Sequence, residues 1–206
     1  PLVIDASQSA GTLPVRLHGT GAAFIAMPGH KGLYGPQGTG LLLCGAAGEP
    51  LLQGGTGSNS LDQSMPDFLP DRHEAGTHNV CGIGGLLAGL RFVRERLPEE
   101  LLAEERALTA LAARGLRQLP GVEEFTGPGQ SGVLSFRCRD LDCEEAAACL
   151  AEAGIAVRAG LHCAPMAHRS GGTLETGTVR VSFSAFNTSA EVRQFLQVCR
   201  TAFLPG

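Results

Sequence analysis

Lysine is almost absent from this sequence of 206 residues: of its 16 lysines and arginines, only Lys31 is a lysine. Arginine stays protonated near neutral pH, whereas a lysine amine can lose its proton and condense with a carbonyl group. Lys31 directly follows His30 in a glycine-rich segment, residues 27–40. This placement indicates that the amine reacts with an aldehyde cofactor. The alternative is a compositional preference for arginine, with Lys31 as an ordinary surface residue.

Other absences exclude broad classes of protein. No apolar run approaches the length of a membrane span and no signal peptide is visible, so we expect a cytoplasmic protein with no membrane partner. The net charge of −4 and the lack of basic clusters argue against nucleic acid as a partner. The seven cysteines are scattered and odd in number, which is typical of reduced thiols rather than of a disulfide framework.

The chain opens without an initiating methionine on an apolar stretch, Leu2 to Ile4, that ends in Asp5. A strand of this buried type needs neighbouring strands on both sides. We therefore expect that sequence upstream of this chain is missing.

Two regions are predicted, with a boundary near residue 97. Residues 1–97 alternate short strands with glycine-rich loops, as in an α/β fold, and residues 98–206 read as a separate α+β unit. Capping pairs at Asp142 and Glu145, and at Thr188 and Glu191, mark two helix starts in the second region. The expected strands are 2–5, 22–27, 40–44, 132–138, 155–158 and 178–184, and the expected helices are 83–97, 99–119, one from 142 to 154, and 188–203.

Four side chains follow the first two strands closely. Asp5 ends the first strand, Gln8 comes three residues later, and His30 and Lys31 follow the second strand. The ends of such strands meet in one crevice above a sheet. Pyridoxal phosphate requires this set: an amine for the Schiff base, a carboxylate for the pyridine nitrogen, and donors for the phenolate and phosphate oxygens. Singly, each residue has a structural interpretation; together with Lys31 they predict a pyridoxal phosphate site.

The sequence also resembles a known family, the class V aminotransferases, and within it the branch of cysteine desulfurases and selenocysteine lyases. The segments that carry the resemblance occur in order along the whole chain: residues 3–8, 29–40, 74–79, 157–165 and 179–188. It implies a pyridoxal-phosphate-dependent transferase of fold type I. Residues 1–97 would be the C-terminal part of the cofactor-binding large domain, residues 98–206 the small C-terminal domain, and the first half of the usual protein would be absent.

The resemblance implies a role for each residue in the first region. Lys31 would form the Schiff base, Asp5 would pair with the pyridine nitrogen, Gln8 would donate to the phenolate oxygen, and His30 would bind phosphate. Thr56 lies in a loop, residues 54–58, that in the family reaches the partner's cofactor phosphate, which implies a homodimer with shared active sites; the alternative is a flexible linker.

In the second region, the resemblance makes Cys163 the nucleophile that takes sulfur from the substrate as a persulfide. Arg180 would pair with the substrate carboxylate, with Arg158 and Asn79 as further substrate-binding residues. His162 would act in catalysis beside Cys163, or would be a loop histidine with a backbone partner. Two departures weaken the match: Pro28 replaces a hydroxyl residue of the phosphate site, and Leu161 replaces a second histidine.

The sequence thus predicts a cysteine desulfurase-like enzyme that removes sulfur or selenium from cysteine or selenocysteine by means of Lys31 and Cys163. Its partners would be a small amino-acid substrate and a sulfur-acceptor protein. Two alternatives stay open: another class V reaction such as transamination, with Cys163 as a bystander, or a truncated chain without catalytic activity. A metal site of His162, Cys163 and His168 lacks the spacing of structural zinc sites, so no metal is expected.

Overall fold

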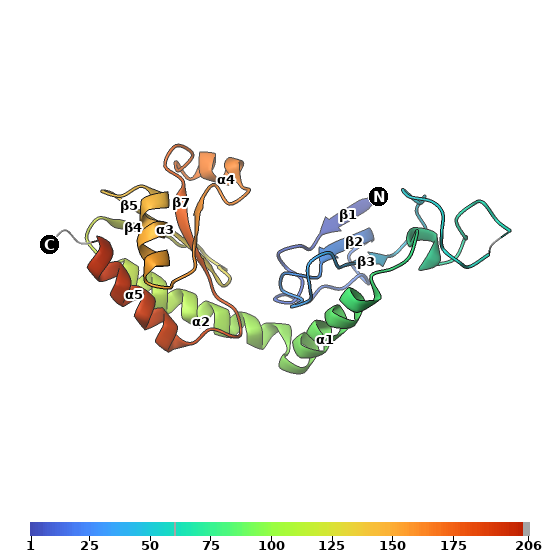
Figure 1. Cartoon of the computed structure of the whole chain (residues 1–206), viewed down its shortest axis with the longest axis horizontal. Helices are drawn as coiled ribbons and strands as arrows, with labels where there is room; N and C mark the ends of the chain where they lie inside the picture. Colours follow the sequence, from blue (N-terminus) through green and yellow to red (C-terminus); the bar gives the residue numbers. More distant parts are fainter. Residues whose placement is uncertain (60, 204–206) are drawn as a thin grey trace. The chain divides into compact units, whose positions relative to one another are not determined.

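The computed structural model describes residues 1–59 and 61–203. It divides into two compact units, Pro1–Glu99 and Glu100–Gly206, and each unit has its own sheet (Figure 1). This division lies close to the boundary expected at residue 97. Within the described ranges, no helix is both long enough and apolar enough to cross a membrane.

The first unit contains a sheet of three strands in the order β1-β2-β3. Strand β1 is Leu2–Asp5, β2 is Ala22–Pro28 and β3 is Gly40–Cys44; β1 is parallel to β2, and β2 is antiparallel to β3. The bounds of β1 and β3 agree with the prediction, while β2 continues to Pro28. Proline has no N–H group, which restricts it to strand ends and edges, and Pro28 occupies the end of β2.

Helix α1, Val80–Arg96, packs against the loop that carries Lys31. It begins earlier than predicted because the Asn79 side chain accepts a hydrogen bond from the Gly82 N–H at 3.0 Å and so caps the helix. Added Cβ atoms on Gly82, Gly85 and Gly89 would meet atoms of residues 33–39 or of Asn79, so these glycines allow the loop to approach closely. A short 3-10 helix, Asp71–His73, precedes α1.

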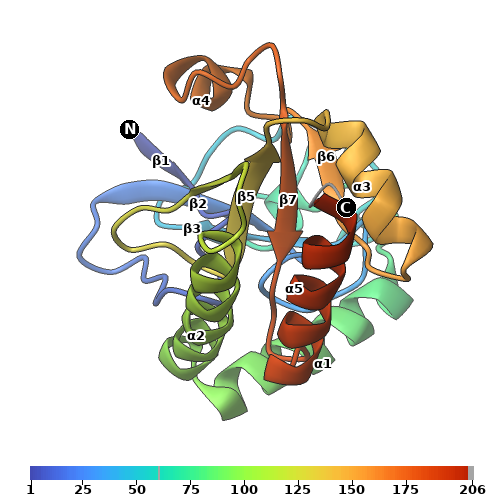
Figure 2. The ribbon, with the colours of Figure 1, turned by 90° about the vertical axis from the view of Figure 1, so that its left-hand side faces the viewer.

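The second unit has a four-stranded antiparallel sheet in the order β4-β5-β7-β6. Figure 2 shows β5, β7 and β6 of this sheet. The elements that build it are α2 (Pro98–Leu116), which begins at the unit boundary, β4 (Val122–Phe125), β5 (Val133–Cys138), α3 (Cys143–Glu152), β6 (Arg158–Gly160), α4 (Pro165–Ser170), β7 (Thr178–Ser182) and α5 (Ser189–Phe203).

Side chains alternate between the two faces of this sheet. Leu134 and Phe136 of β5, with Val179 and Val181 of β7, are buried in a core to which α2, α3 and α5 contribute. Because the side chains of a strand alternate, Arg180 lies on the opposite face. The core therefore packs on one face of the sheet, and Arg180 lies on the other face.

Further sequence-based expectations need correction; one is the strand expected at 178–184, which ends at Ser182. The strand predicted at 155–158 lies at Arg158–Gly160: Ile155 and Val157 pack against the core, but neither residue belongs to the strand ladder with β7. The second helix ends at Leu116 rather than at 119. Strand β4 and helix α4 were not predicted, because each is short and has little apolar periodicity. Both predicted capping boxes are confirmed, at Asp142 and at Thr188.

Candidate active site

The loop that carries Lys31 is closed by backbone hydrogen bonds. The Gly29 N–H donates to the Thr39 carbonyl and the Gly35 N–H to the Gly29 carbonyl, both at 2.7 Å. Within the loop, the Tyr34 N–H donates to the Lys31 carbonyl at 2.9 Å. Lys31 is exposed on this hydrogen-bonded turn.

The turn after β1 contacts this loop directly. Gly11 has a positive φ of 90°, and a Cβ at Gly11 would collide with the carbonyl oxygen of Gly32. Only a glycine permits both the conformation and the close approach. The contact brings the segment that follows Asp5 next to Lys31.

Asp5 remains a carboxylate in this setting. Hydrogen bonds from Ser7 hold the pKa of Asp5 below its usual value, and the positive charge of Lys31 lowers it further. One of these bonds is the Ser7 N–H donating to Asp5 Oδ1 at 2.8 Å. An ionised carboxylate can accept a hydrogen bond from a protonated pyridine nitrogen, and a lysine amine can condense with an aldehyde, so Asp5 and Lys31 fit pyridoxal phosphate. Gln8 and His30 are exposed on the adjoining turns.

Thr56 and Asn79 lie in two segments of the first unit, residues 54–58 and residues 74–79, that a hydrogen bond joins. The Gly76 N–H donates to the Gly54 carbonyl at 2.9 Å and so ties the loop of Thr56 to residues 74–79. Asn79 Oδ1 is engaged as the cap of α1. The phosphate-binding role of Thr56 and the substrate-binding role of Asn79 stay predictions.

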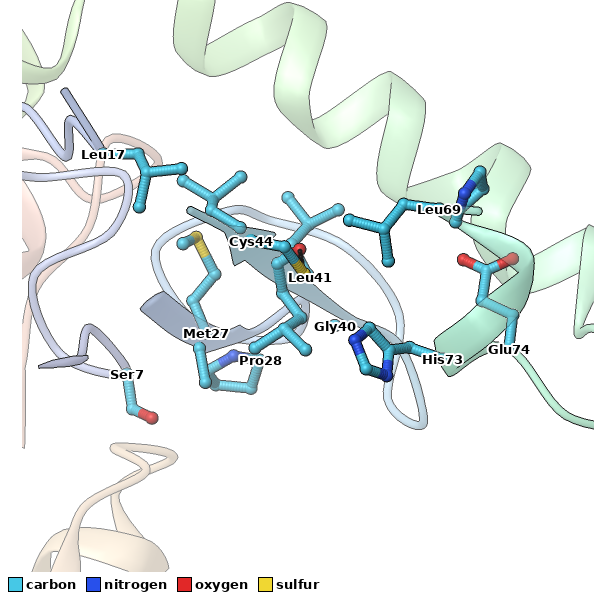
Figure 3. Close-up of a pocket in the computed structure, with 14 residues that line it drawn as sticks. Ser7, Leu17, Met27, Pro28, Gly40, Leu41, Cys44, Leu69, His73 and Glu74 are labelled. Atoms are coloured by element: carbon cyan, nitrogen blue, oxygen red, sulfur yellow. Dashed lines mark hydrogen bonds between the residues drawn. The ribbon is translucent and has the colours of Figure 1, made fainter. Parts of the chain in front are cut away.

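A hollow of about 960 Å³ on the first unit does not coincide with these residues (Figure 3). Leucines and Met27 of β2 and β3 line most of it, with His73 and Glu74 at one end. Neither Lys31 nor Asp5 belongs to its lining. Because its wall is mainly apolar and contains neither the amine nor the carboxylate that the cofactor needs, we do not assign the cofactor to this hollow.

In the second unit, Cys163 lies in a strained loop between β6 and α4. His162 and Cys163 are consecutive non-glycine residues with positive φ values, 54° and 61°. Each such residue costs about 1–2 kcal/mol, so the surrounding contacts must hold the loop. The Cys163 thiol is exposed, and Arg158 Nη2 donates to its sulfur at 3.4 Å.

The His162 ring is anchored to β7. Its Nε2 lies 3.1 Å from the Thr178 carbonyl oxygen and 2.9 Å from Thr178 Oγ1. A carbonyl only accepts, so the proton is assigned to Nε2. Burial lowers the pKa of His162, and the charges of Arg180, His168 and Arg158 lower it further. A neutral imidazole adds no positive charge beside Cys163, so that charge comes from Arg158; the catalytic role of His162 stays a prediction.

Two arginines face each other across neighbouring strands. Arg158 of β6 is in register with Arg180 of β7. Like charges directly opposite each other destabilise a sheet. Arg180 Nε is buried and has no hydrogen-bond partner among the described residues. This pair is a suitable site for an anion such as a carboxylate.

Sequence reasoning missed the roles of His168 and Thr173, which are both buried. His168 Nδ1 lies 2.8 Å from Thr173 Oγ1, and its ring lies 5.4 Å from that of His162, centroid to centroid. The sequence does show a second histidine, His168, between two predicted strands, but it does not show that Thr173 is the partner of this histidine. In the described part of the chain, no group of three or more His, Cys, Asp or Glu side chains could hold a metal ion.

Each unit thus brings together part of the predicted site. Asp5 and Lys31 are neighbours in the first unit, and Arg158, His162, Cys163 and Arg180 form one cluster in the second. An exposed lysine is the group that a carbonyl cofactor would need, and an exposed thiol beside an arginine is a candidate sulfur nucleophile.

Comparison with known proteins identifies the family. Residues 1–195 match the model of the family "Aminotransferase class-V". The chain belongs to the class V aminotransferase family, which is pyridoxal-phosphate-dependent.

The relatives point to one branch of this family. The chain is 37% identical over 202 residues to a probable cysteine desulfurase of Methanothermobacter thermautotrophicus, covering 93% of this chain and 50% of that protein. A probable cysteine desulfurase of Pyrococcus abyssi is 35% identical over 205 residues, covering 95% of this chain and 50% of that protein. The chain therefore spans about half the length of these relatives.

Solved structures agree with the α/β fold. A cysteine desulfurase from Thermococcus onnurineus is 36% identical and superposes with a TM-score of 0.86, covering 98% of this chain and 52% of that one. A cysteine desulfurase from Escherichia coli is 32% identical with a TM-score of 0.86, covering 97% of this chain and 51% of that one. The fold is that of about half of a cysteine desulfurase.

Proposed function

We propose that the chain is part of a pyridoxal-phosphate-dependent cysteine desulfurase, with residues 1–97 in its large domain and residues 98–206 as its small domain. The observation that carries the proposal is the exposed Cys163 thiol, 3.4 Å from Arg158 Nη2 in a loop with strained backbone. The identity of 37% to a protein named as a probable cysteine desulfurase supports the same branch.

The residues of the first unit would hold the cofactor. Lys31 supplies the amine for its aldehyde, Asp5 accepts from its ring nitrogen, Gln8 donates to the phenolate oxygen, and His30 and Thr56 contact the phosphate. Pyridoxal phosphate, when bound, supplies a ring that withdraws electrons from the substrate carbon. The Lys31 amine would be the group that moves a proton at the α-carbon of the substrate.

The residues of the second unit would bind the substrate and receive the sulfur. Arg180 and Arg158 bind the substrate carboxylate, and Asn79 is a further candidate substrate-binding residue. The Cys163 thiolate attacks the sulfur of a substrate cysteine, or the selenium of a selenocysteine. The bond from that atom to the β-carbon of the substrate breaks, its electron pair stays with the β-carbon, and a proton is added there. The products are alanine and a persulfide, or its selenium analogue, on Cys163.

The remaining proposals concern partners and location. The loop of Thr56 suits a homodimer with shared active sites, and the exposed position of Cys163 suits transfer of sulfur to an acceptor protein. The reduced cysteines of the described chain suit the cytoplasm.

Replacement of Cys163 tests the proposal. In the protein that contains this chain, Cys163→Ala should reduce sulfide release from cysteine in the presence of a reductant at least ~100-fold, because the nucleophile is lost. The matched control is Cys81→Ala, at an exposed thiol in the first unit, and it should leave the rate unchanged.

The visible absorbance of the bound cofactor should persist in both variants, because Lys31 is intact. Full sulfide release by Cys163→Ala would move the protein to another class V reaction such as transamination. Absence of cofactor absorbance in the parent protein would mean that it binds no cofactor.

A further inference from the structure

His168 occupies a position that the proposed chemistry does not use. It lies in the short helix α4 and is only 7% exposed. Its Nδ1 is 2.8 Å from Thr173 Oγ1 and 3.3 Å from the Thr173 carbonyl oxygen. In return, the Thr173 N–H donates to the His168 carbonyl at 2.9 Å. Side chain and backbone thus fix these two residues to each other.

The His168 ring also contacts the ring of His162. The centroids are 5.4 Å apart and the planes are tilted by 46°. His162 is held at its Nε2 edge by Thr178 of β7. The His162 ring therefore has two supports, one from the sheet and one from α4.

Cys163 is adjacent to the residue that these contacts hold. It follows His162 directly, and both residues have positive φ values. Side-chain-bearing residues adopt such conformations only where the surroundings hold them. Helix α4 has six residues, which is too short for a stable isolated helix, so contacts of its side chains must fix it.

We propose that His168 is a positioning residue for Cys163: bonded to Thr173 and packed on the His162 ring, it holds the Cys163 thiol beside Arg158. This inference rests on the proposed function, because it concerns the thiol that would accept the sulfur. If His168 only stabilised α4, its replacement would lower the stability of the fold without a selective change in the reactivity of Cys163. A positioning residue acts on the reactivity of one thiol.

Alkylation of the parent protein and its variants with iodoacetamide, followed by peptide mapping, tests the inference. The alkylation rate of Cys163 is divided by that of Cys81, an exposed thiol of the first unit. Effects that change the alkylation of both thiols equally then cancel. His168→Leu keeps the volume but loses the bond to Thr173. It should lower this ratio at least ~3-fold near pH 7, because the thiol leaves the guanidinium of Arg158.

Three further variants make the result specific. His168→Asn keeps an amide group that can bond to Thr173 and should restore most of the ratio. Thr173→Val removes the hydroxyl partner and should lower the ratio, even if His168→Leu fails to fold. His18→Leu, at an exposed histidine of the first unit, should change nothing.

An unchanged or raised ratio in His168→Leu, or an equal loss in His168→Asn, would overturn the inference. The assay needs neither cofactor nor substrate, so its outcome is separate from that of the proposed function. Sulfide release measured in parallel distinguishes the two: a parent protein that releases no sulfide but shows the expected alkylation pattern would refute only the function.

Discussion

The two units differ in how fully they bury their sheets. In the second unit, Leu134 and Phe136 are fully buried beneath three helices. In the first unit, Leu2 is 50% exposed, Val3 60% and Leu42 47%, although all three belong to strands. One face of the second sheet is covered by packed helices, whereas several apolar side chains of the first sheet are exposed.

This difference changes how each unit positions its chemistry. Arg158 and Arg180 extend from a sheet that packed side chains hold in place. The Lys31 loop depends more on backbone hydrogen bonds and on glycines that allow close approach. Substitutions in the core should therefore damage the second unit most, and substitutions at glycines the first.

The largest expected effect is in the core of the second unit. Leu134→Ala should lower the free energy of unfolding by about 2–5 kcal/mol, because Leu134 is fully buried and the vacated volume cannot be refilled. The matched change in the first unit, Leu42→Ala, should cost less than ~1 kcal/mol, since Leu42 is 47% exposed. Urea unfolding followed by circular dichroism measures both. Equal losses would contradict the contrast between the two sheets.

A smaller effect should appear at the glycines of the first unit. Gly11 and Gly19 have similar φ values, 90° and 86°, but only at Gly11 would a Cβ meet another atom, the carbonyl oxygen of Gly32. Gly19→Ala should cost about 1 kcal/mol for its conformation alone. Gly11→Ala should cost at least ~1 kcal/mol more, because backbone must move. Thermal unfolding compares them, and equal melting temperatures would show that this contact does not constrain the Lys31 loop.

Much of the fold could be predicted from local patterns. Apolar runs bounded by loops predicted β1 and β3, and the capping boxes at Asp142 and Thr188 act through neighbouring residues. The errors lie where tertiary contacts determine the bounds of a helix or strand. Apolar residues such as Ile155 suggest a strand, yet Ile155 packs on the core while pairing with β7 begins at Arg158.

The candidate residues could be predicted by type, and only part of their arrangement could. The rarity of lysine, the position of Asp5 and Lys31 after the first two strands, and the resemblance to a family indicated Lys31, Asp5 and Cys163 as candidates. The register of Arg158 with Arg180, and the bonds from His162 to Thr178 and from His168 to Thr173, depend on how segments pair in space. No local periodicity encodes such contacts, so these features could come only from the structure.

The smallest expected effect is a dependence of stability on pH in the second unit. Burial and the nearby charges of Arg180, His168 and Arg158 lower the pKa of His162 from its usual 6.5. The unfolded chain therefore binds more protons at this residue than the folded chain does. The stability that this residue contributes is present above pH 6.5, and it is lost as the pH falls through the folded pKa.

His162→Gln should remove this part of the pH dependence. Melting temperatures measured from about pH 7.5 to about pH 5 should fall less steeply in the variant than in the parent, because glutamine takes up no proton on unfolding. His18→Gln is the matched control, since His18 is exposed, and its curve should follow that of the parent. If His162→Gln and the parent lost stability at the same rate below pH 6.5, protonation of His162 would not oppose the fold, and the cationic cluster around Cys163 would tolerate a further positive charge.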